Sequence, residues 1–273
     1  MIAIVLGTKA ELIKTVPVMK VLEKRGIEYT FIHTGHHPLE EMCESFGVKK
    51  PDLTLFIPPK STSRFFLQTK KALTWGFKLG FKLWKALTSL KNLKLLLIHG
   101  DTITTGTASV VSSFGRWLVA HLEAGLRSYD LRMPEEFNRR LTDHLSALLF
   151  APTKTAVRIL RKEDVWGRIY LTGNTVIDAC EQHVPLALRK SHIMNQIDFD
   201  EFCLATVHRK ENVDDPFVLK NFVEAFTSSP LPVVIPLHPR TKKRLEEHKL
   251  LPKLKDSPNV KLLPSLGYLD FLR

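Results

Sequence analysis

The chain has 273 residues, with 40 Lys and Arg against 28 Asp and Glu, so its formal net charge is +12. Hydrophobic residues make up 44% and charged residues 25%, which excludes a disordered or fibrous protein and predicts one large or two ordinary domains. Three widely separated cysteines (Cys43, Cys180 and Cys203) indicate a reducing compartment, so we expect a cytoplasmic protein. The opening segment MIAIVLGTKAE predicts a strand rather than a signal peptide, and no apolar run reaches membrane-spanning length.

Short apolar segments alternate with amphipathic ones along the chain. Strands are predicted at Ile2–Leu6, Tyr29–His33, Leu95–His99, Trp117–His121, Ala147–Ala151, Ile169–Thr172, Phe202–Val207, Val233–Leu237 and Val260–Leu263. Helices are predicted at Glu11–Lys24, Glu136–Ser146, Lys154–Lys162, Thr175–Leu188, Pro216–Thr227 and Thr241–His248. The alternation predicts the α/β class, with parallel sheets. A boundary after Gly173 would separate residues 1–173 from residues 174–273, and the second domain, with three strands, is interpreted as incomplete.

The segment from Lys60 to His99 carries much of the positive charge and no acidic residue. Aromatic residues are interleaved with its lysines, and the spacing predicts that Lys71, Lys78, Lys82 and Lys85 share one face of a helix. One interpretation is a crossover helix with a solvated lysine face. The other is a peripheral membrane contact through the basic aromatic stretch 64–91. Nucleic-acid binding is not expected, because no DNA- or RNA-reading motif accompanies the charge.

Acidic residues follow two neighbouring predicted strands and begin the next helix. Asp101 comes after Leu95–His99, Glu123 after the next strand, and Glu135 at the start of PEEFNRRLTD. Ligands of open parallel sheets bind beyond the carboxyl ends of the strands, so these carboxylates should meet there, with Arg127 and Arg139 beside them. Glu135 alone could simply interact with the helix dipole. The set together predicts an acid/base site with a clamp for an anion.

Other loops at the predicted strand ends carry basic residues. The turn Gly7-Thr8-Lys9 precedes a helix N-terminus that could face an anion, although such a turn is often structural. The HTGHH segment could suggest a metal site, but spacing alone supplies no further ligand, and no metal is expected. In the second region, ATVHRKEN places His208 and Arg209 after a strand, and PLHPRT does the same for His238. His208 is either a solvated loop residue or a group facing the first domain.

Taken in order, these motifs resemble the non-hydrolysing UDP-N-acetylglucosamine 2-epimerases over nearly the whole chain. The resemblance rests on GTKAELIKTVPV, HTGHH, HGDT, HLEAGLRS, PEEFNRRLTD, YLTGNTVID, ATVHRKEN and LGYLDFL. It implies two Rossmann-like domains of GT-B-like architecture and an isomerase that interconverts UDP-GlcNAc and UDP-ManNAc for cell-surface polysaccharide biosynthesis. It further implies elimination and re-addition of UDP, a homodimer, and no cofactor.

The resemblance also implies roles for individual residues. Asp101, Glu123 and Glu135 match the acid/base carboxylates, and His208 matches a histidine of the cleft. Several acid/base groups are expected because one fixed base cannot serve both faces of the sugar. The residues that would contact the substrate are Lys9, His37, Arg127, Asn138, Arg139, Arg209 and His238.

Two departures from the family pattern affect the expected activity. Lys9 and Ala10 replace an arginine and a proline, and lysine lacks the bidentate fork of arginine. The family's DSGG-x-Q-E-E diphosphate motif has no match, so we interpret the chain as C-terminally truncated and expect weak or absent activity alone. The alternatives are a hydrolysing relative, a membrane-associated GT-B glycosyltransferase, and an inactive or split-enzyme fragment with a separate C-terminal partner.

Overall fold

The computed structural model describes residues 1–57 and 69–273, with the backbone alone for residues 69–73. The chain divides into two compact parts, unit 1 (Met1–Gln182) and unit 2 (His183–Arg273). Each part contains a parallel sheet with helices, which confirms the predicted α/β class. The division falls within helix α7 (Thr175–Lys190), and the predicted boundary after Gly173 stays a prediction.

Unit 1 is built on one seven-stranded parallel sheet with the order β3-β2-β1-β4-β5-β6-β7. Its strands are β1 (Ile2–Leu6), β2 (Tyr29–His33), β3 (Leu53–Thr54), β4 (Leu95–His99), β5 (Leu118–Leu122), β6 (Leu148–Ala151) and β7 (Arg168–Leu171). The strand order reverses direction between β1 and β4. The polar residues that follow these central strands therefore lie at the switch point where open α/β sheets bind ligands.

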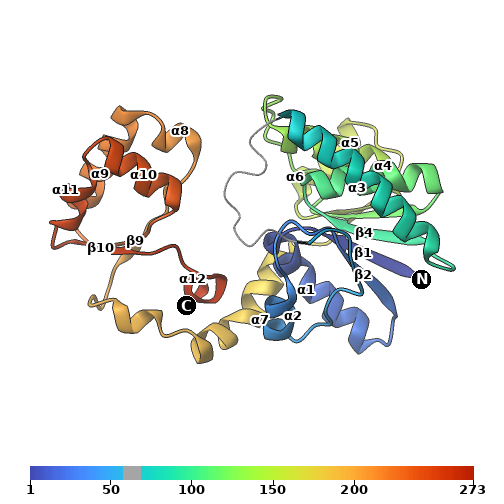
Figure 1. Ribbon diagram of the computed structural model, residues 1–273, viewed down its shortest axis with the longest axis horizontal. Helices are drawn as coiled ribbons and strands as arrows, with labels where there is room; N and C mark the ends of the chain where they lie inside the picture. The colour runs from blue at the N-terminus through green and yellow to red at the C-terminus, as the bar shows by residue number, and fades with distance from the viewer. Residues whose placement is uncertain (58–68) are drawn as a thin grey trace. The chain divides into compact units, whose positions relative to one another are not determined.

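Helices cover both faces of this sheet (Figure 1). One face carries α1 (Lys9–Lys24) and α2 (Glu40–Phe46). The opposite face carries α3 (Thr69–Ser89), α4 (Ile103–Gly115), α5 (Pro134–Leu145) and α6 (Lys154–Lys162). This division follows from right-handed crossovers, because the chain first moves from β1 toward β3 and then turns back through β4 to β7.

The core of unit 1 lies between the sheet and these helix layers. Toward α3 and α4, Val5 and Ile98 pack with Leu83 and Leu87. Toward α1, the strand residues Ile4 and Leu6 and the helix residues Leu12, Val16 and Met19 are fully buried. Side chains on both faces of β1 are therefore buried, as expected for a central parallel strand that is covered on both sides.

Unit 2 has a three-stranded parallel sheet with the order β10-β9-β8. Its strands are β8 (Cys203–Leu204), β9 (Val233–Pro236) and β10 (Val260–Leu263). The helices are a 3₁₀ turn (Ile193–Gln196), α8 (Lys210–Val213), α9 (Pro216–Thr227), α10 (Pro239–Glu247), α11 (Leu251–Lys255) and α12 (Tyr268–Leu272). Leu219, Val223, Val233, Leu245 and Leu254 belong to its buried core.

Most predicted elements form with small shifts at their ends, but one predicted strand is much shorter and one strand was not predicted. The strand predicted at Phe202–Val207 is reduced to Cys203–Leu204, because its pairing with β9 covers only these two residues. Strand β3 was not predicted, since it comprises only two residues beside β2. A two-residue strand offers no alternation from which a sequence pattern can be recognised.

Part of the basic aromatic stretch is described, as helix α3. Arg64, Phe65 and Phe66 lie outside the described residues, as do the side chains of Lys70 and Lys71. Within the described part of the chain, no helix combines the length and apolar character needed to cross a bilayer.

Candidate active site

Glu123 stands directly after β5, at the carboxyl edge of the unit 1 sheet. Its backbone adopts the left-handed region, with φ of 65°, and Gly125 two residues later has φ of 82°. A non-glycine residue held in this region is uncommon and often marks a functional site. The carboxylate is 10% exposed. The turn after β5 thus holds a carboxylate largely out of solvent at the switch point of the sheet.

Three side chains from distant parts of the sequence surround that carboxylate. Lys14 Nζ, from α1, lies 2.8 Å from Oε1 and 3.0 Å from Oε2 of Glu123. Asn174 Nδ2, from the loop after β7, donates to Oε1 at 3.0 Å. His99 Nε2, at the end of β4, lies 3.6 Å from Oε2. A helix, a strand end and a loop thus each contribute one side chain that holds this carboxylate.

Burial would raise the pKa of Glu123, but His99, Lys14 and Asn174 together lower it below the usual value of 4.5. Burial has the dominant effect on His99 and lowers the pKa of its imidazole to about 3. At neutral pH the pair is therefore an ionised carboxylate beside a neutral imidazole. An ionised carboxylate in such a setting can accept a proton from a bound substrate.

Asp101 lies two residues after β4 and forms an ion pair with Arg139 of α5. The side chains of Asp101 and Arg139 are 27% and 22% exposed. Asn138 Nδ2 donates to the Asp101 backbone carbonyl at 3.0 Å. A Cβ at Gly106 would lie 2.7 Å from Asn138 Oδ1, so this glycine permits the close approach of α4 and α5. The structure thus brings Asp101, Asn138 and Arg139 together.

Glu11 ties the first loop of the sheet to the loop that carries Asp101. Its Oε2 accepts from Gly7 N at 2.8 Å and from Thr8 N at 2.7 Å, which completes a capping box on α1. Its Oε1 accepts from the hydroxyls of Thr102 at 2.6 Å and Thr105 at 3.3 Å. Burial raises the pKa of this carboxyl, while the hydrogen bonds lower it in part. Glu11 therefore joins the β1–α1 and β4–α4 loops through one buried group.

Arg127 does not lie where an anion clamp was expected. Its guanidinium is fully buried and lies 2.8 Å from Asp143 and 2.6 Å from Glu163. Asp143, also fully buried, accepts from His121 Nδ1 at 2.7 Å and from Gly125 N at 3.1 Å. The guanidinium can be buried because the carboxylates of Asp143 and Glu163 neutralise its charge. The prediction that Arg127 contacts a substrate phosphate has no support from this placement, and Arg127 instead fixes the loop after Glu123.

Glu135 occupies the first turn of α5 and is exposed. Within the described chain it has no hydrogen bond or ion pair that joins it to Asp101 or Glu123. The neighbouring Glu136 is fully buried, accepts from Ser128 N at 2.8 Å and pairs with Arg140 at 3.0 Å. Glu136 therefore holds the loop before α5, whereas Glu135 is free to meet a ligand. Its predicted catalytic role remains a prediction.

The loops after β1 and β2 meet through a histidine. Lys9 is exposed, and its backbone N–H donates to His37 Nδ1 at 3.4 Å. His36 is buried, stacks on Trp75 with ring centroids 4.3 Å apart, and has a pKa lowered to about 4 by burial. Gly7 is required here, since a Cβ would lie 2.4 Å from His36 Nδ1. No group of three or more His, Cys, Asp or Glu side chains in the described chain is placed to hold a metal ion.

In unit 2, two of the predicted site residues, His208 and His238, lie next to each other. The rings of His208 and His238 have centroids 5.6 Å apart. His238 caps α10 by accepting from Arg240 N at 3.2 Å, and burial, His208 and Arg240 lower its pKa. Arg209 is exposed at the N-cap of α8.

Several residues of the unit 1 cluster were not singled out by the sequence analysis. Lys14, His99 and Asn174 hold Glu123, and Glu11 and Asp143 organise the adjoining loops. All of them lie within motifs that the sequence analysis quotes, Asp143 being the last residue of PEEFNRRLTD. The usable signal for Lys14 is its spacing of three residues from Glu11 on α1, which places both on one face of the helix.

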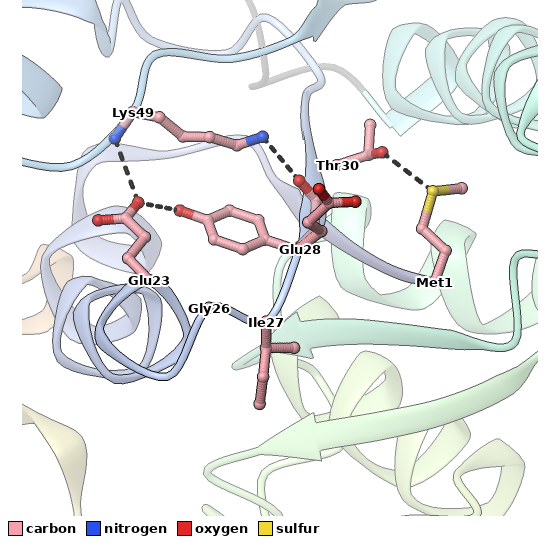
Figure 2. Close-up of a pocket in the computed structure, with 8 residues that line it drawn as sticks. Met1, Glu23, Gly26, Ile27, Glu28, Thr30 and Lys49 are labelled. Carbon is pink, nitrogen blue, oxygen red and sulfur yellow. Dashed lines mark hydrogen bonds between the residues drawn. The ribbon is translucent and has the colours of Figure 1, made fainter.

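A hollow of about 610 Å³ lies at the other edge of the sheet (Figure 2). It is lined by Met1, Glu23, Gly26, Ile27, Glu28, Tyr29, Thr30 and Lys49. Because Met1 and Tyr29 stand at the amino ends of β1 and β2, this hollow is remote from the carboxyl edge. None of the predicted site residues lines it.

Comparison with known proteins identifies the family. The family model described as UDP-N-acetylglucosamine 2-epimerase matches residues 20–273. The chain belongs to this family. The UDP-N-acetylglucosamine 2-epimerase of Methanocaldococcus jannaschii is 37% identical over 99% of this chain and 75% of its own length. A Pseudomonas aeruginosa relative, UDP-2,3-diacetamido-2,3-dideoxy-D-glucuronate 2-epimerase, is 32% identical over 98% of this chain and 73% of its own.

A solved structure of the family agrees in fold. The M. jannaschii epimerase in complex with UDP-GlcNAc and UDP has a TM-score of 0.80 and 36% identity, covering 99% of this chain and 75% of that one. This similarity confirms the predicted GT-B-like class of the two units. The chain therefore spans about three quarters of the length of its epimerase relatives.

Proposed function

We propose that this protein is a UDP-N-acetylglucosamine 2-epimerase, interconverting UDP-GlcNAc and UDP-ManNAc. The observation that carries the proposal is the Glu123 carboxylate, ionised and held by Lys14 and Asn174 at the switch point of the sheet. Membership of the epimerase family supports the nucleotide sugar as the substrate.

The reaction requires removal of the hydrogen at C2 of the sugar and its return to the other face. That hydrogen is weakly acidic, so its removal is coupled to departure of UDP from C1, and UDP then adds back to the 2-acetamidoglucal. Glu123 is a suitable base, because its lowered pKa keeps it ionised at neutral pH. Lys14 and Asn174 restrict the carboxylate to one position, which reduces the entropy lost on reaching the transition state.

Asp101 and Glu135 are proposed as the further acid/base groups. Asp101 is held by Arg139 and is partly exposed, so a substrate can reach it. Arg139, Asn138, Lys9 and His37 are proposed to contact the sugar or diphosphate, and Arg139 and Lys9 would supply the cations that the departing UDP needs. Arg127 is left out of the binding set, because Asp143 and Glu163 already neutralise it.

In unit 2 we keep His208 as a proposed catalytic residue and Arg209 and His238 as proposed substrate contacts. The adjacency of the two histidines supports a common role for them. A cytoplasmic location is also proposed, since Cys43, Cys180 and Cys203 are all free thiols. We likewise propose a homodimer, for which family membership is the support.

The test is to incubate the 273-residue chain with UDP-GlcNAc in D₂O and to follow the products by proton NMR. The expected result is slow formation of UDP-ManNAc, with deuterium at C2 of both nucleotide sugars, because the chain has no match to the family's diphosphate motif. Isotope incorporation accumulates with time, so the assay also detects slow turnover. Free ManNAc together with UDP would instead identify a hydrolysing enzyme, and no incorporation above a protein-free control would contradict the proposal.

The same assay resolves which sugar is preferred. One relative acts on UDP-2,3-diacetamido-2,3-dideoxy-D-glucuronate, as its name states, so that compound should be tested in parallel. We expect faster C2 exchange with UDP-GlcNAc. Faster exchange with the glucuronate derivative would retain the chemistry and replace the substrate.

A further inference from the structure

Helix α3 exposes three large aromatic side chains. Phe77 is 81% exposed, Phe81 is 72% exposed, and Trp84 is 39% exposed. The spacing of four and three residues places them along one side of the helix. Trp84 contacts Trp117, with ring centroids 5.7 Å apart, so the row continues toward the end of α4. Exposed aromatic side chains gathered in this way mark an interaction surface more often than isolated ones do.

The core does not need these aromatic side chains. The opposite side of α3 supplies Leu79, Leu83 and Leu87, all fully buried. Gly80 lies against α4, since a Cβ there would be 3.6 Å from Thr107 and 3.7 Å from Val111. The helix is therefore already anchored to the sheet and to α4, and Phe77 and Phe81 remain outside that packing.

Lysines line the other side of the exposed surface. Lys78, Lys82 and Lys85 are exposed, and Lys82 lies over the Phe56 ring at 4.2 Å while donating to the Leu55 carbonyl at 2.6 Å. Neither α3 nor α4 contains an Asp or Glu. The aromatic row thus lies beside a lysine row that has no acidic residue of its own helices to pair with.

We propose that this face of α3, defined by Phe77, Phe81, Trp84, Lys78 and Lys85, docks on an anionic lipid bilayer. Aromatic rings would enter the headgroup region while the lysines meet lipid phosphates, which is the usual pattern of interfacial helices. Lysine stems cover apolar surface and extend their charges outward, so both rows can face the membrane together. The contact is peripheral and reversible, because the apolar row is short.

Charge favours the bilayer over a second copy of this chain. A two-fold contact on this face would oppose Lys78 and Lys85 to their own copies, with no acidic residue of α3 or α4 between them. The exposed side of a helix is convex, whereas single-stranded nucleic acids are held in charged grooves with stacking platforms. These two alternatives are outcomes of the test.

The experiment is sedimentation of the 273-residue chain with vesicles at low salt. One set contains phosphatidylcholine alone, and the other phosphatidylcholine and phosphatidylserine in equal parts. We expect binding to the anionic vesicles, and weaker binding as salt is raised. Lys78→Gln/Lys85→Gln should weaken partitioning roughly thirtyfold, given the attraction of each lysine to an anionic surface. Phe77→Ser/Phe81→Ser should weaken it at least about tenfold.

Matched variants in unit 2 serve as controls. Phe217 is 72% exposed on α9, and Phe217→Ser should leave binding unchanged. Lys249→Gln/Lys255→Gln removes two exposed lysines and should cost little. Unchanged thermal unfolding of each variant would show that the fold is intact.

Three results would overturn the proposal. The first is no sedimentation with anionic vesicles at low salt. The second is light scattering that shows a dimer for the parent and a monomer for Phe77→Ser/Phe81→Ser, which would assign the face to a second copy. The third is that the parent binds an oligothymidylate but not the vesicles, and that Lys78→Gln/Lys85→Gln no longer binds the oligothymidylate.

Discussion

Two groups of arginines and carboxylates show how differently the same chemistry is used in the two units. In unit 1, Arg127 and Asp143 are both fully buried and 2.8 Å apart. In unit 2, Arg244 and Asp214 are 2.9 Å apart, but their side chains are 36% and 22% exposed. The distances are nearly equal, so burial is what separates the two pairs.

Burial decides what each pair does. A buried pair is costly to break, because a lone charge would remain in a poorly solvated place. Asp143 also accepts hydrogen bonds from Gly125 N and His121 Nδ1, and these contacts fix the loop that carries Glu123. An exposed pair is screened by water and contributes little. Buried pairs thus support the sheet edge of unit 1 that carries Glu123, while the described contacts of unit 2 leave its charged groups near solvent.

The largest expected effect on stability comes from removing Asp143. Asp143→Ala should lower the free energy of unfolding by about 3–5 kcal/mol, because Arg127 would lose a buried partner. Chemical denaturation measures this value. The matched change Asp214→Ala in unit 2 should cost less than about 1 kcal/mol. Equal losses for the two variants would show that burial does not distinguish the pairs.

A smaller loss is expected at Glu11, which links two loops by hydrogen bonds. Glu11→Ala leaves Gly7 N and Thr8 N without their acceptor, and should cost about 2–4 kcal/mol. Glu11→Gln should cost less than half as much, since an amide oxygen can still accept from these groups. The exposed Glu28→Ala is the control. A Glu11→Ala protein as stable as the parent would refute the linking role.

The buried imidazole of His99 predicts a pH dependence of stability. Its pKa is about 3 in the folded protein against about 6.5 unfolded. Between these values the unfolded chain binds more protons, so the free energy of unfolding falls as pH falls. His99→Gln should remove up to about 1.4 kcal/mol per pH unit of this slope. Urea titrations between pH 6.5 and 5 test this, with exposed His192→Gln expected to match the parent.

The smallest predicted change is a shift of a pH profile. Lys14→Met removes a cation that helps to lower the pKa of Glu123, so that pKa should rise. The acid limb of the C2 exchange rate would then move to higher pH, since protonated Glu123 cannot accept the proton. Lys24→Met, on the same helix, should not move it. An unmoved limb in Lys14→Met would mean that Glu123 does not set the profile.

Sequence patterns located this edge but not its internal contacts. Asp101 and Glu123 were found because parallel strands place their following residues at one edge. Lys14 is 109 residues from Glu123 in the sequence, so their contact depends on the packing of α1, which no local pattern encodes. Arg127 and Arg139 both follow a predicted strand end, so the sequence does not distinguish their roles. In the structure, only Arg127 is buried against Asp143 and Glu163.

Strand lengths were also predicted unequally from the sequence. Central strands such as Ile2–Leu6 and Leu95–His99 were predicted to the residue, because burial on both faces gives continuous apolar runs. Strand β8, paired with β9 alone, keeps only two residues of the predicted six-residue segment. Apolar composition continues past the point where hydrogen-bonded pairing ends.

The most direct test of the account compares C2 deuterium incorporation from D₂O into UDP-GlcNAc by the parent and by Glu123→Gln. Glutamine preserves the size of the side chain and removes the base, while exposed Glu41→Gln serves as the control. We expect Glu123→Gln to lose about a thousandfold in rate, the usual range for a general base, with Glu41→Gln unchanged. Retention of the rate within about tenfold of the parent would contradict the assignment of Glu123 as the base.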